Sequence, residues 1–212
     1  MSAFSHAAYS LSVARLEDLP PEGPPELAIV GRSNVGKSSA INALAGRRRL
    51  AFVSKTPGRT QTLNFFDLGP LGRLVDLPGY GYARVPLAVR EQWDRLVGGY
   101  LQVRASLVAV AVIMDARHAP TPQDAQLLRW LKPMGRQLIV LLSKCDKLSR
   151  AGREAARRRV REALLAEGVR AELLLFSSLT GEGVEDARTL LETWLRAAQP
   201  GPGNKRPPAK GM

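Results

Sequence analysis

Two kinds of apolar pattern alternate along the chain. Short runs rich in Val, Ile and Leu, among them ELAIV (26–30), LVAVAVIMD (107–115) and RQLIVLLSK (136–144), are typical of strands buried on both faces. Longer stretches with apolar residues three and four positions apart lie between and after them. These stretches predict helices over residues 38–46, about 86–104, 122–131, 150–167 and 184–198.

Three further runs complete the set of predicted strands. TLNFFDLG (62–69) and GRLVDLP (72–78) are β-like and are separated by the turn-prone GPLG, and AELLLFSS (171–178) follows the helix at 150–167. Strands that alternate with helices of this length indicate a mostly parallel sheet with helices on both faces. We therefore predict a doubly wound α/β fold around a six-stranded sheet.

Composition changes at both ends of the chain. Residues 1–25 end in PPEGPP, which is typical of a loop leading into the first core strand. Residues 199–212, QPGPGNKRPPAKGM, are rich in Pro, Gly and basic residues, which predicts disorder. We expect a partly ordered extension over 1–25, one domain over 26–198 and a basic tail. Inside the domain, RRRLAFVSKTPGRTQ (47–61) has no sustained period and predicts a mobile loop.

Charge and cysteine content indicate the kind of partner and the cellular compartment to expect. The formal net charge is +12, which an enzyme of small metabolites does not need, so a polyanionic partner is expected. We find no run long enough to span a bilayer, no signal-peptide pattern, and a single cysteine that cannot form an internal disulfide. These features indicate a cytoplasmic protein. Because the basic tail lacks an apolar face for membrane insertion, RNA is the preferred polyanion.

The segment GRSNVGKS after the first core strand matches the pattern G-x-x-x-x-G-K-[ST] of a phosphate-binding loop (P-loop). Its glycines let the backbone wrap around a phosphate, and successive N–H groups with the following helix N-terminus supply positive potential. In this arrangement Lys37 reaches the β- and γ-phosphates, and the hydroxyl of Ser38 binds Mg²⁺. The candidate loop residues are Gly31, Arg32, Ser33, Asn34, Val35, Gly36, Lys37 and Ser38.

Two later segments, at the carboxyl ends of predicted strands, indicate which nucleotide binds. Asp146 can accept hydrogen bonds from guanine N1–H and from its 2-amino group, and adenine offers neither. Lys144 can lay its aliphatic stem along the base, and the backbone of Ser177 and Ser178 can donate to guanine O6. The usual form of the first segment opens with Asn, but the hydroxyl of Ser143 can still bridge to the phosphate loop. GTP is therefore predicted rather than ATP.

Several segments together carry a resemblance to a known family. GRSNVGKSS, SKTPGRTQTLNFF, RLVDLPGYGYA, SKCDKL and FSS occur in the order and spacing of bacterial EngB-type GTPases, over roughly residues 8–198. That family belongs to the class of translation-factor-like GTPases that also holds the Era and EngA types. Ser143 fits as well, since this family opens the fourth motif with a hydroxyl residue.

The resemblance implies further GTP-binding and Mg²⁺-binding residues. Thr56, Thr60 and Thr62 are all candidate Mg²⁺ ligands on chemistry alone, and the resemblance selects Thr60. Asp76 would join Ser38 and Thr60 at the ion, directly or through a water. By resemblance the GTP site also includes Gly58, Arg59, Thr60, Gln61, Thr62, Asp76, Leu77, Pro78, Gly79, Ser143, Lys144, Cys145, Asp146, Phe176, Ser177 and Ser178.

Hydrolysis of GTP needs positioning and charge neutralisation more than covalent chemistry. The candidate catalytic residues are Lys37, Thr60, Gly79 and Asn34, with the N–H of Gly79 contacting the γ-phosphate. Where other switch GTPases place a water-orienting Gln, this chain has Tyr80. A phenol is a poor base at neutral pH, so Tyr80 is expected to pack outward or against a partner.

Three sources of the missing catalytic help stay open. Gln61 could reach the water, and Arg59 or Lys55 could neutralise charge. The side chain of Asn34 could help to hold K⁺, since related GTPases with Asn at this place depend on potassium. Alternatively, Asn34 only pins the loop by hydrogen bonding, and turnover is slow until the ribosome assists.

Motifs and resemblance together predict a GTP-binding switch that hydrolyses GTP slowly. The resemblance implies a role in assembly of the large ribosomal subunit, with its precursor and rRNA as partners of a monomer, and in normal cell division and septation. The alternative is a GTP-sensing placeholder on the ribosome with negligible hydrolysis, and a P-loop ATPase or kinase is a more distant rival. Basic residues that could contact RNA, or only form solvated faces, are Arg47, Arg48, Arg49, Arg150, Arg153, Arg157, Arg158, Arg159, Arg161, Lys205, Arg206 and Lys210.

Overall fold

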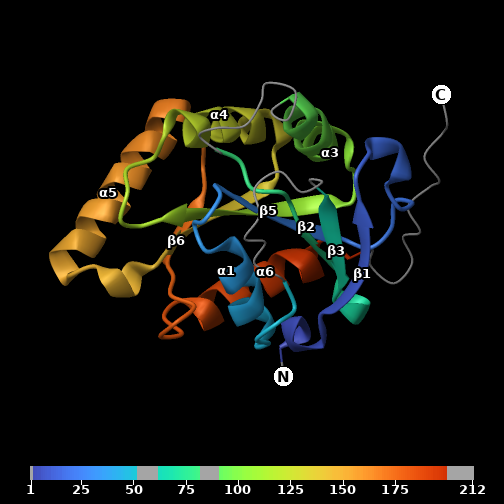
Figure 1. Ribbon diagram of the computed structural model, residues 1–212, viewed down its shortest axis with the longest axis horizontal. Helices are drawn as coiled ribbons and strands as arrows, with labels where there is room; N and C mark the ends of the chain where they lie inside the picture. Colours follow the sequence, from blue (N-terminus) through green and yellow to red (C-terminus); the bar gives the residue numbers. More distant parts are fainter. Residues whose placement is uncertain (1, 52–61, 82–90, 200–212) are drawn as a thin grey trace.

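A sheet of seven strands runs through the part of the computed structural model that can be described, which is residues 2–51, 62–81 and 91–199 (Figure 1). The strands are β1 Ala8–Val13, β2 Glu26–Gly31, β3 Leu63–Asp67, β4 Arg73–Asp76, β5 Leu107–Asp115, β6 Gln137–Ser143 and β7 Glu172–Leu175. They lie in the order β1-β3-β4-β2-β5-β6-β7. The section from β4 to β7 is parallel, whereas β3 runs antiparallel to both β1 and β4.

The doubly wound α/β fold is confirmed, but the predicted count of six strands is wrong. β1, in the N-terminal segment, pairs with β3 and forms an additional edge strand. Most of β1 is exposed, and Val13 is its one buried residue. Backbone pairing rather than an apolar run makes this segment a strand, so its pattern of apolar residues does not predict it.

Helices cover both faces of the sheet (Figure 1). α1 (Lys37–Ala45) and α6 (Val184–Ala197) pack on one face, and α3 (Gly99–Val103), α4 (Pro122–Leu131) and α5 (Arg150–Glu167) pack on the other. The bounds predicted for α4 and α5 are confirmed. The helix predicted from about residue 86 is described from residue 91 onward, with a π-helical stretch at Asp94–Gly98 before α3. Among the described helices, we find none long and apolar enough to cross a membrane.

The position of β5 inside the sheet explains why its sequence is apolar throughout. Val110 and Val112 point into the core under α3, α4 and α5, while Ala111 and Ile113 point into the core under α1 and α6. All four side chains are 0% exposed. A strand that is buried on both faces needs apolar residues at every position, which is the pattern that predicted this strand.

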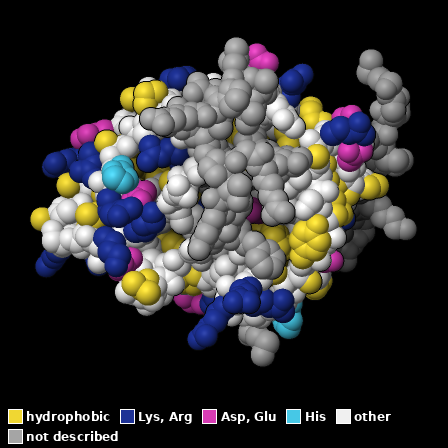
Figure 2. Space-filling view, in the orientation of Figure 1, with side chains coloured by type: hydrophobic (Ala, Val, Ile, Leu, Met, Phe, Trp, Pro, Cys, Tyr) yellow, Lys and Arg dark blue, Asp and Glu magenta, His cyan; other side chains and the backbone are white. Residues whose placement is uncertain are grey.

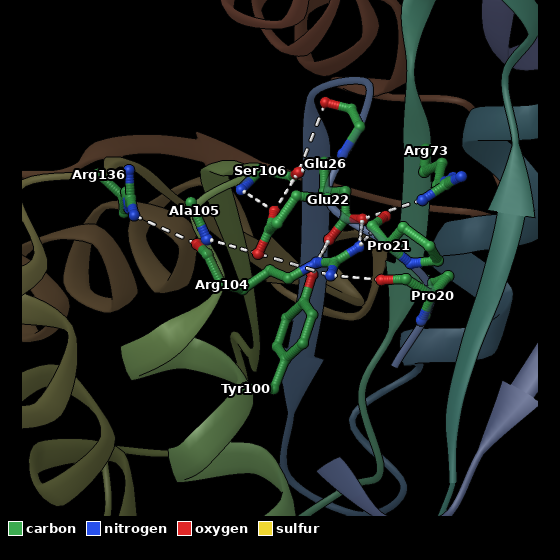
Figure 3. A network of polar contacts seen from close by, with 11 residues as sticks. Pro20, Pro21, Glu22, Glu26, Arg73, Tyr100, Arg104, Ala105, Ser106 and Arg136 are labelled. Atoms are coloured by element: carbon green, nitrogen blue, oxygen red, sulfur yellow. Dashed lines mark hydrogen bonds and ion pairs between the residues drawn. The ribbon is translucent and has the colours of Figure 1, made fainter. Parts of the chain in front are cut away.

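A buried ionic network lies at the start of β2, the end opposite to Gly31 (Figure 3). The carboxylate of Glu26, 0% exposed, accepts hydrogen bonds from Arg104 Nε at 2.8 Å and Nη2 at 2.5 Å, and from the Tyr100 hydroxyl at 2.9 Å. Arg104 also donates to the carbonyl of Pro20 at 2.8 Å. The network ties the N-terminal loop and the end of α3 to the first residue of the central sheet. Two buried charges are tolerated there because each is paired with the other.

Candidate functional site

Four loops meet at one edge of the sheet, after the carboxyl ends of β2, β4, β6 and β7. The four strands run parallel, so their carboxyl ends point the same way. Open α/β sheets bind ligands outside this edge. The residues that the sequence assigns to phosphate and to base therefore lie in loops at the same end of the molecule.

The phosphate loop leaves β2 at Gly31 and enters α1 at Lys37. Asn34 and Gly36 adopt left-handed backbone, with φ of 64° and 97°. A Cβ on Gly31 would lie 2.7 Å from the carbonyl oxygen of Ile113, so a side chain has no room there. The two glycines of the motif are thus required by the path of the backbone, which wraps over the N-terminus of α1, where the helix dipole favours an anion.

Lys37 and Asp76 bring opposite charges together beside this loop. Lys37 Nζ forms an ion pair with Asp76 Oδ1, and the two side chains are 14% and 10% exposed. The Asp76 carboxylate and the Ser38 hydroxyl are oxygen donors of the kind that Mg²⁺ prefers, so these residues fit that ion. Within the described ranges there is no group of three or more His, Cys, Asp or Glu that could hold a metal.

The DLPG segment (76–79) continues past β4 along the phosphate loop. Leu77 N–H donates to Ile29 O at 2.9 Å, and the backbone of Tyr80 then pairs with the loop itself. Tyr80 N–H donates to Gly31 O at 3.3 Å, and Ser33 N–H donates to Tyr80 O at 2.8 Å. The backbone around Gly79 is therefore held directly against the loop that would carry the phosphates.

The expectation that Tyr80 packs outward or against a partner is wrong. Its side chain is 6% exposed, and its hydroxyl donates to Asp124 Oδ1 on α4 at 2.6 Å. Burial and the neighbouring charge of Asp124 raise the pKa of the Tyr80 phenol well above its ordinary value. Tyr80 therefore stays protonated at neutral pH and cannot act as a general base.

The loops after β6 and β7 are joined through Asp146 and Ser177. The Ser177 hydroxyl donates to Asp146 Oδ1 at 2.7 Å and accepts from the N–H groups of Leu179 at 3.2 Å and Thr180 at 3.1 Å. The hydrogen bond from Ser177 lowers the pKa of Asp146, which keeps the carboxylate ionised and able to accept at neutral pH. Of the two backbone donors predicted for guanine O6, Ser177 N–H already donates to Glu182 O at 2.9 Å, so Ser178 N–H stays the prediction for that role.

The loop after β6 is also fastened to the phosphate loop. As predicted from the sequence, the Ser143 hydroxyl reaches that loop, where it donates to Val35 O at 2.6 Å. Lys144 Nζ donates to Asn34 O at 2.8 Å and to Asp115 Oδ2 at 2.9 Å. The base-binding and phosphate-binding segments are thus parts of one connected unit.

Cys145, within this loop, packs in the interior. It is 0% exposed, and burial together with the nearby charge of Glu182 raises the pKa of its thiol to about 11. A thiol of this kind is a poor nucleophile at neutral pH, so Cys145 contributes packing rather than chemistry. Phe176, 1% exposed, packs in the core in the same way.

Two residues outside the predicted nucleotide motifs position the site. Asp115, at the end of β5, orients Lys144. Burial would by itself raise the pKa of Asp115, but hydrogen bonds from Arg117 and Lys144 hold this pKa well below its usual range. Asn42, on α1, accepts from Leu50 N–H at 2.9 Å and Ala51 N–H at 2.8 Å. The first part of the loop predicted to be mobile, residues 47–51, is therefore held by a side chain. The sequence signal for this contact is an Asn inside a predicted helix, a position where Asn is disfavoured unless its side chain finds a partner.

Several predicted site residues lie outside the described residues: Gly58, Arg59, Thr60 and Gln61, with the further candidates Lys55 and Thr56. The tail from Pro200 onward lies outside as well. Thr62 is described, and its hydroxyl donates to Asn64 Oδ1 at 3.1 Å.

Comparison with known proteins gives the chain close relatives. A family model described as "50S ribosome-binding GTPase" matches residues 26–144. The chain is 50% identical over 214 residues to a probable GTP-binding protein EngB of Dechloromonas aromatica, covering 100% of this chain and 97% of that protein. It is also 50% identical over 192 residues to the probable GTP-binding protein EngB of Nitrosomonas europaea, covering 91% and 86%.

Solved structures share the fold. A crystal structure of a probable GTP-binding protein EngB superposes with a TM-score of 0.65 at 20% sequence identity, over 81% of this chain and 99% of that one. The structure of Era in complex with MgGDPNP and a 16S ribosomal RNA segment superposes with a TM-score of 0.61 at 19% identity, over 82% and 57%. At these identities the likeness establishes the fold alone.

Proposed function

This chain belongs to the EngB family of GTP-binding proteins, and from that premise we propose that it is a Mg²⁺-dependent GTPase switch that acts in assembly of the large ribosomal subunit. Its G domain would bind GTP and GDP at the edge of the sheet where the four loops meet. By analogy with the family, the same activity would support normal cell division and septation.

The surroundings of Asp146 carry this proposal. An ionised carboxylate, held by Ser177 at 2.7 Å, lies in a loop that Ser143 and Lys144 tie to the phosphate loop. Such a carboxylate pairs with the two donors of guanine and would be left unpaired by adenine. A rigid link between a guanine-selective acceptor and a phosphate cradle favours a GTP-specific protein over an ATPase or kinase.

For hydrolysis, the chain would use charge and positioning. Ser38, Thr60 and Asp76 would hold Mg²⁺, which when bound neutralises charge on the phosphates. Lys37 would leave Asp76 for the β- and γ-phosphates, and Gly79 N–H would donate to the γ-phosphate. Because Tyr80 is buried and protonated, it does not orient the attacking water, which supports slow intrinsic turnover.

Asn34 would supply part of a K⁺ site. It sits at the turn of the phosphate loop with a left-handed φ of 64°, and its backbone carbonyl oxygen accepts from Lys144, so the loop backbone that carries the side chain is held in place. Replacing K⁺ by Na⁺ at constant ionic strength is expected to slow GTP hydrolysis severalfold, because Na⁺ prefers a smaller oxygen cage. Phosphate release in the two salts measures this, with Asn34→Ala as the variant that removes the difference. Equal rates in both salts would rule out the K⁺ site and leave Asn34 as a loop-pinning residue.

A ribosomal partner is supported by charge. The net charge is +12, and Figure 2 shows Lys and Arg side chains gathered over α5 and near the end of α1. Exposed members of these groups are Arg47, Arg48, Arg49, Arg150, Arg158 and Arg161. Others on α5 have local roles, since Arg153 binds Glu182 at 3.0 Å. Together with the family description, this surface favours rRNA of the large subunit as the partner of a cytoplasmic monomer.

Co-sedimentation with ribosomal subunits tests the proposal. The chain is expected to pellet with large subunits or their precursors in GTP more than in GDP, and the bound fraction is expected to fall steeply as salt rises, because RNA phosphates release counterions. A linear fall of log affinity with log salt would support contact with RNA. Binding to small subunits alone, or none in either nucleotide, would contradict it.

The alternative is a GTP-sensing placeholder on the ribosome with negligible hydrolysis. The burial of Tyr80 is the observation that favours it. GTP turnover with and without large subunits separates the two: stimulated turnover supports a GTPase switch, whereas nucleotide-dependent binding without turnover supports the placeholder.

A further inference from the structure

The two neighbours of Gly79 are each fastened to the side of the molecule that carries α4. On one side, Trp93 Nε1 donates to the carbonyl of Pro78 at 2.8 Å. On the other side, the Tyr80 hydroxyl donates to Asp124 Oδ1 at 2.6 Å. A residue held at both neighbours has little freedom to move its own peptide group.

Asp124 is itself a rigid anchor. It is 6% exposed and lies in the first turn of α4, where its second carboxylate oxygen accepts from the N–H of Thr121 at 2.6 Å and from the Thr121 hydroxyl at 2.7 Å. The Thr121 side chain in turn accepts from Asp124 N–H, which forms a capping box at the start of the helix. The phenol of Tyr80 therefore bonds to a carboxylate whose direction is fixed by the helix cap.

Aromatic packing fixes the same segment from a second direction. The rings of Tyr80 and Trp93 meet edge to face with centroids 5.8 Å apart, and Trp93 stacks on Trp130 of α4 at 6.0 Å. Such pairs add stabilisation beyond their buried area. The hydrogen bonds and the ring contacts together join Pro78, Tyr80, Trp93 and α4 into one packed group.

On its other side this segment contacts the phosphate loop closely. The backbone of Tyr80 pairs with Gly31 and Ser33, and a Cβ on Gly79 would lie 3.3 Å from both Gly31 O and Ser33 N. The peptide of Gly79 therefore lies between the phosphate loop and the group anchored on α4.

We propose that Tyr80 and Asp124 are a positioning pair that fixes the Gly79 peptide for recognition of the γ-phosphate. The inference rests on the proposed function, in which Gly79 N–H donates to that phosphate. Neither side chain touches the nucleotide: Tyr80 acts through the backbone of Gly79, and Asp124 acts through Tyr80. Exchange of GTP for GDP would in turn change the contact of Tyr80 with the N-terminus of α4.

Tyr80→Phe tests the pair, because it removes only the hydroxyl and keeps the ring. Its affinity for a non-hydrolysable GTP analogue is expected to fall about 5–10-fold, the net loss typical of one ordinary hydrogen bond, while GDP affinity stays within about twofold. Asp124→Asn is expected to lower the affinity for the GTP analogue relative to that for GDP in the same way. The double variant is expected to lose no more of this affinity than the more affected single variant. Tyr9→Phe, on a side chain that is 59% exposed, is the matched control and is expected to change nothing.

The ratio of the two affinities separates positioning from plain stability. Both nucleotides are titrated on the same preparation, so partial unfolding cancels from the ratio even if a variant melts at a lower temperature. An unchanged ratio, whether both affinities fall in parallel or neither falls, would overturn the positioning role while leaving the proposed function in place. A wild-type chain that fails to bind either guanine nucleotide would instead overturn the proposed function.

Discussion

Asp146→Asn is expected to lower the affinity for GTP by up to roughly 10⁴-fold, the lower end of the range in which a site built to hydrogen-bond a substrate N–H rejects a mismatched partner. The carboxylate offers two acceptor oxygens to guanine N1–H and the 2-amino group, whereas the amide presents an NH₂ donor in place of one of them. Xanthine carries a carbonyl where guanine carries the amino group, so the variant is expected to prefer xanthosine nucleotides. Direct calorimetric titration of GTP, XTP and ATP into the wild type and the variant measures the shift.

The matched control for this change is Asp186→Asn. Asp186 lies exposed in the first turn of α6, and the substitution makes the same chemical change away from the four loops. Its nucleotide preference is expected to stay that of the wild type. If Asp146→Asn also keeps the wild-type affinity for GTP, then Asp146 does not read the base, and the assignment of the loop after β6 to guanine is wrong.

The parts of the fold that local chemistry specifies were predictable. α4 begins at the predicted residue because Thr121 caps it and Pro122 occupies its first turn. α5 is capped by Ser149 and stopped by Gly168, which takes a left-handed φ of 63°. Start and stop signals of this kind lie within a few residues of the boundary they set. β1 has no such signal, since its pairing partner is β3, far along the chain.

The candidate site also has a part that local sequence specifies and a part that it does not. The phosphate loop consists of consecutive residues, and its backbone requires glycine at the positions where the sequence has it. The burial of Tyr80 depends instead on Asp124, 44 residues away, and the orientation of Lys144 depends on Asp115, 29 residues away. Periodicity cannot report which distant side chain will supply an acceptor. The prediction that Tyr80 packs outward, which was based on the pKa of an isolated phenol, is therefore wrong.

β2 separates two tasks along its own length. Its carboxyl end supplies Gly31 and the loop whose left-handed backbone suits phosphate binding. Its amino end begins with Glu26, which joins α3 and the N-terminal loop through Arg104. Changes at the two ends of this strand are therefore expected to have different signatures, one in nucleotide binding and the other in the free energy of unfolding.

Glu26→Ala is accordingly expected to destabilise the folded chain by about 3–5 kcal/mol, the usual cost of leaving one member of a buried ion pair unpaired. Arg104, 3% exposed, would lose its buried partner and keep the partly exposed carboxylate of Glu22 at 3.6 Å, and the Tyr100 hydroxyl would lose its acceptor. For a chain of this size the loss corresponds to a fall of roughly 6–20 °C in the midpoint of thermal unfolding. Nucleotide affinity, measured below that midpoint, is expected to stay within about twofold of wild type because the network lies at the far end of β2.

Three further variants decide whether the loss comes from an unpaired charge. Glu17→Ala breaks an ion pair with Arg15 in which both side chains are 64% exposed, and it is expected to leave the midpoint unchanged. The double variant Glu26→Gln with Arg104→Met removes both charges while Gln can still accept from Tyr100. It is expected to unfold closer to the wild-type midpoint than either Glu26→Ala or Arg104→Met alone, since a buried pair can be replaced by neutral residues at little cost. A double variant less stable than both singles would mean that the attraction between the two charges, rather than the penalty of leaving one unpaired, stabilises this end of the sheet.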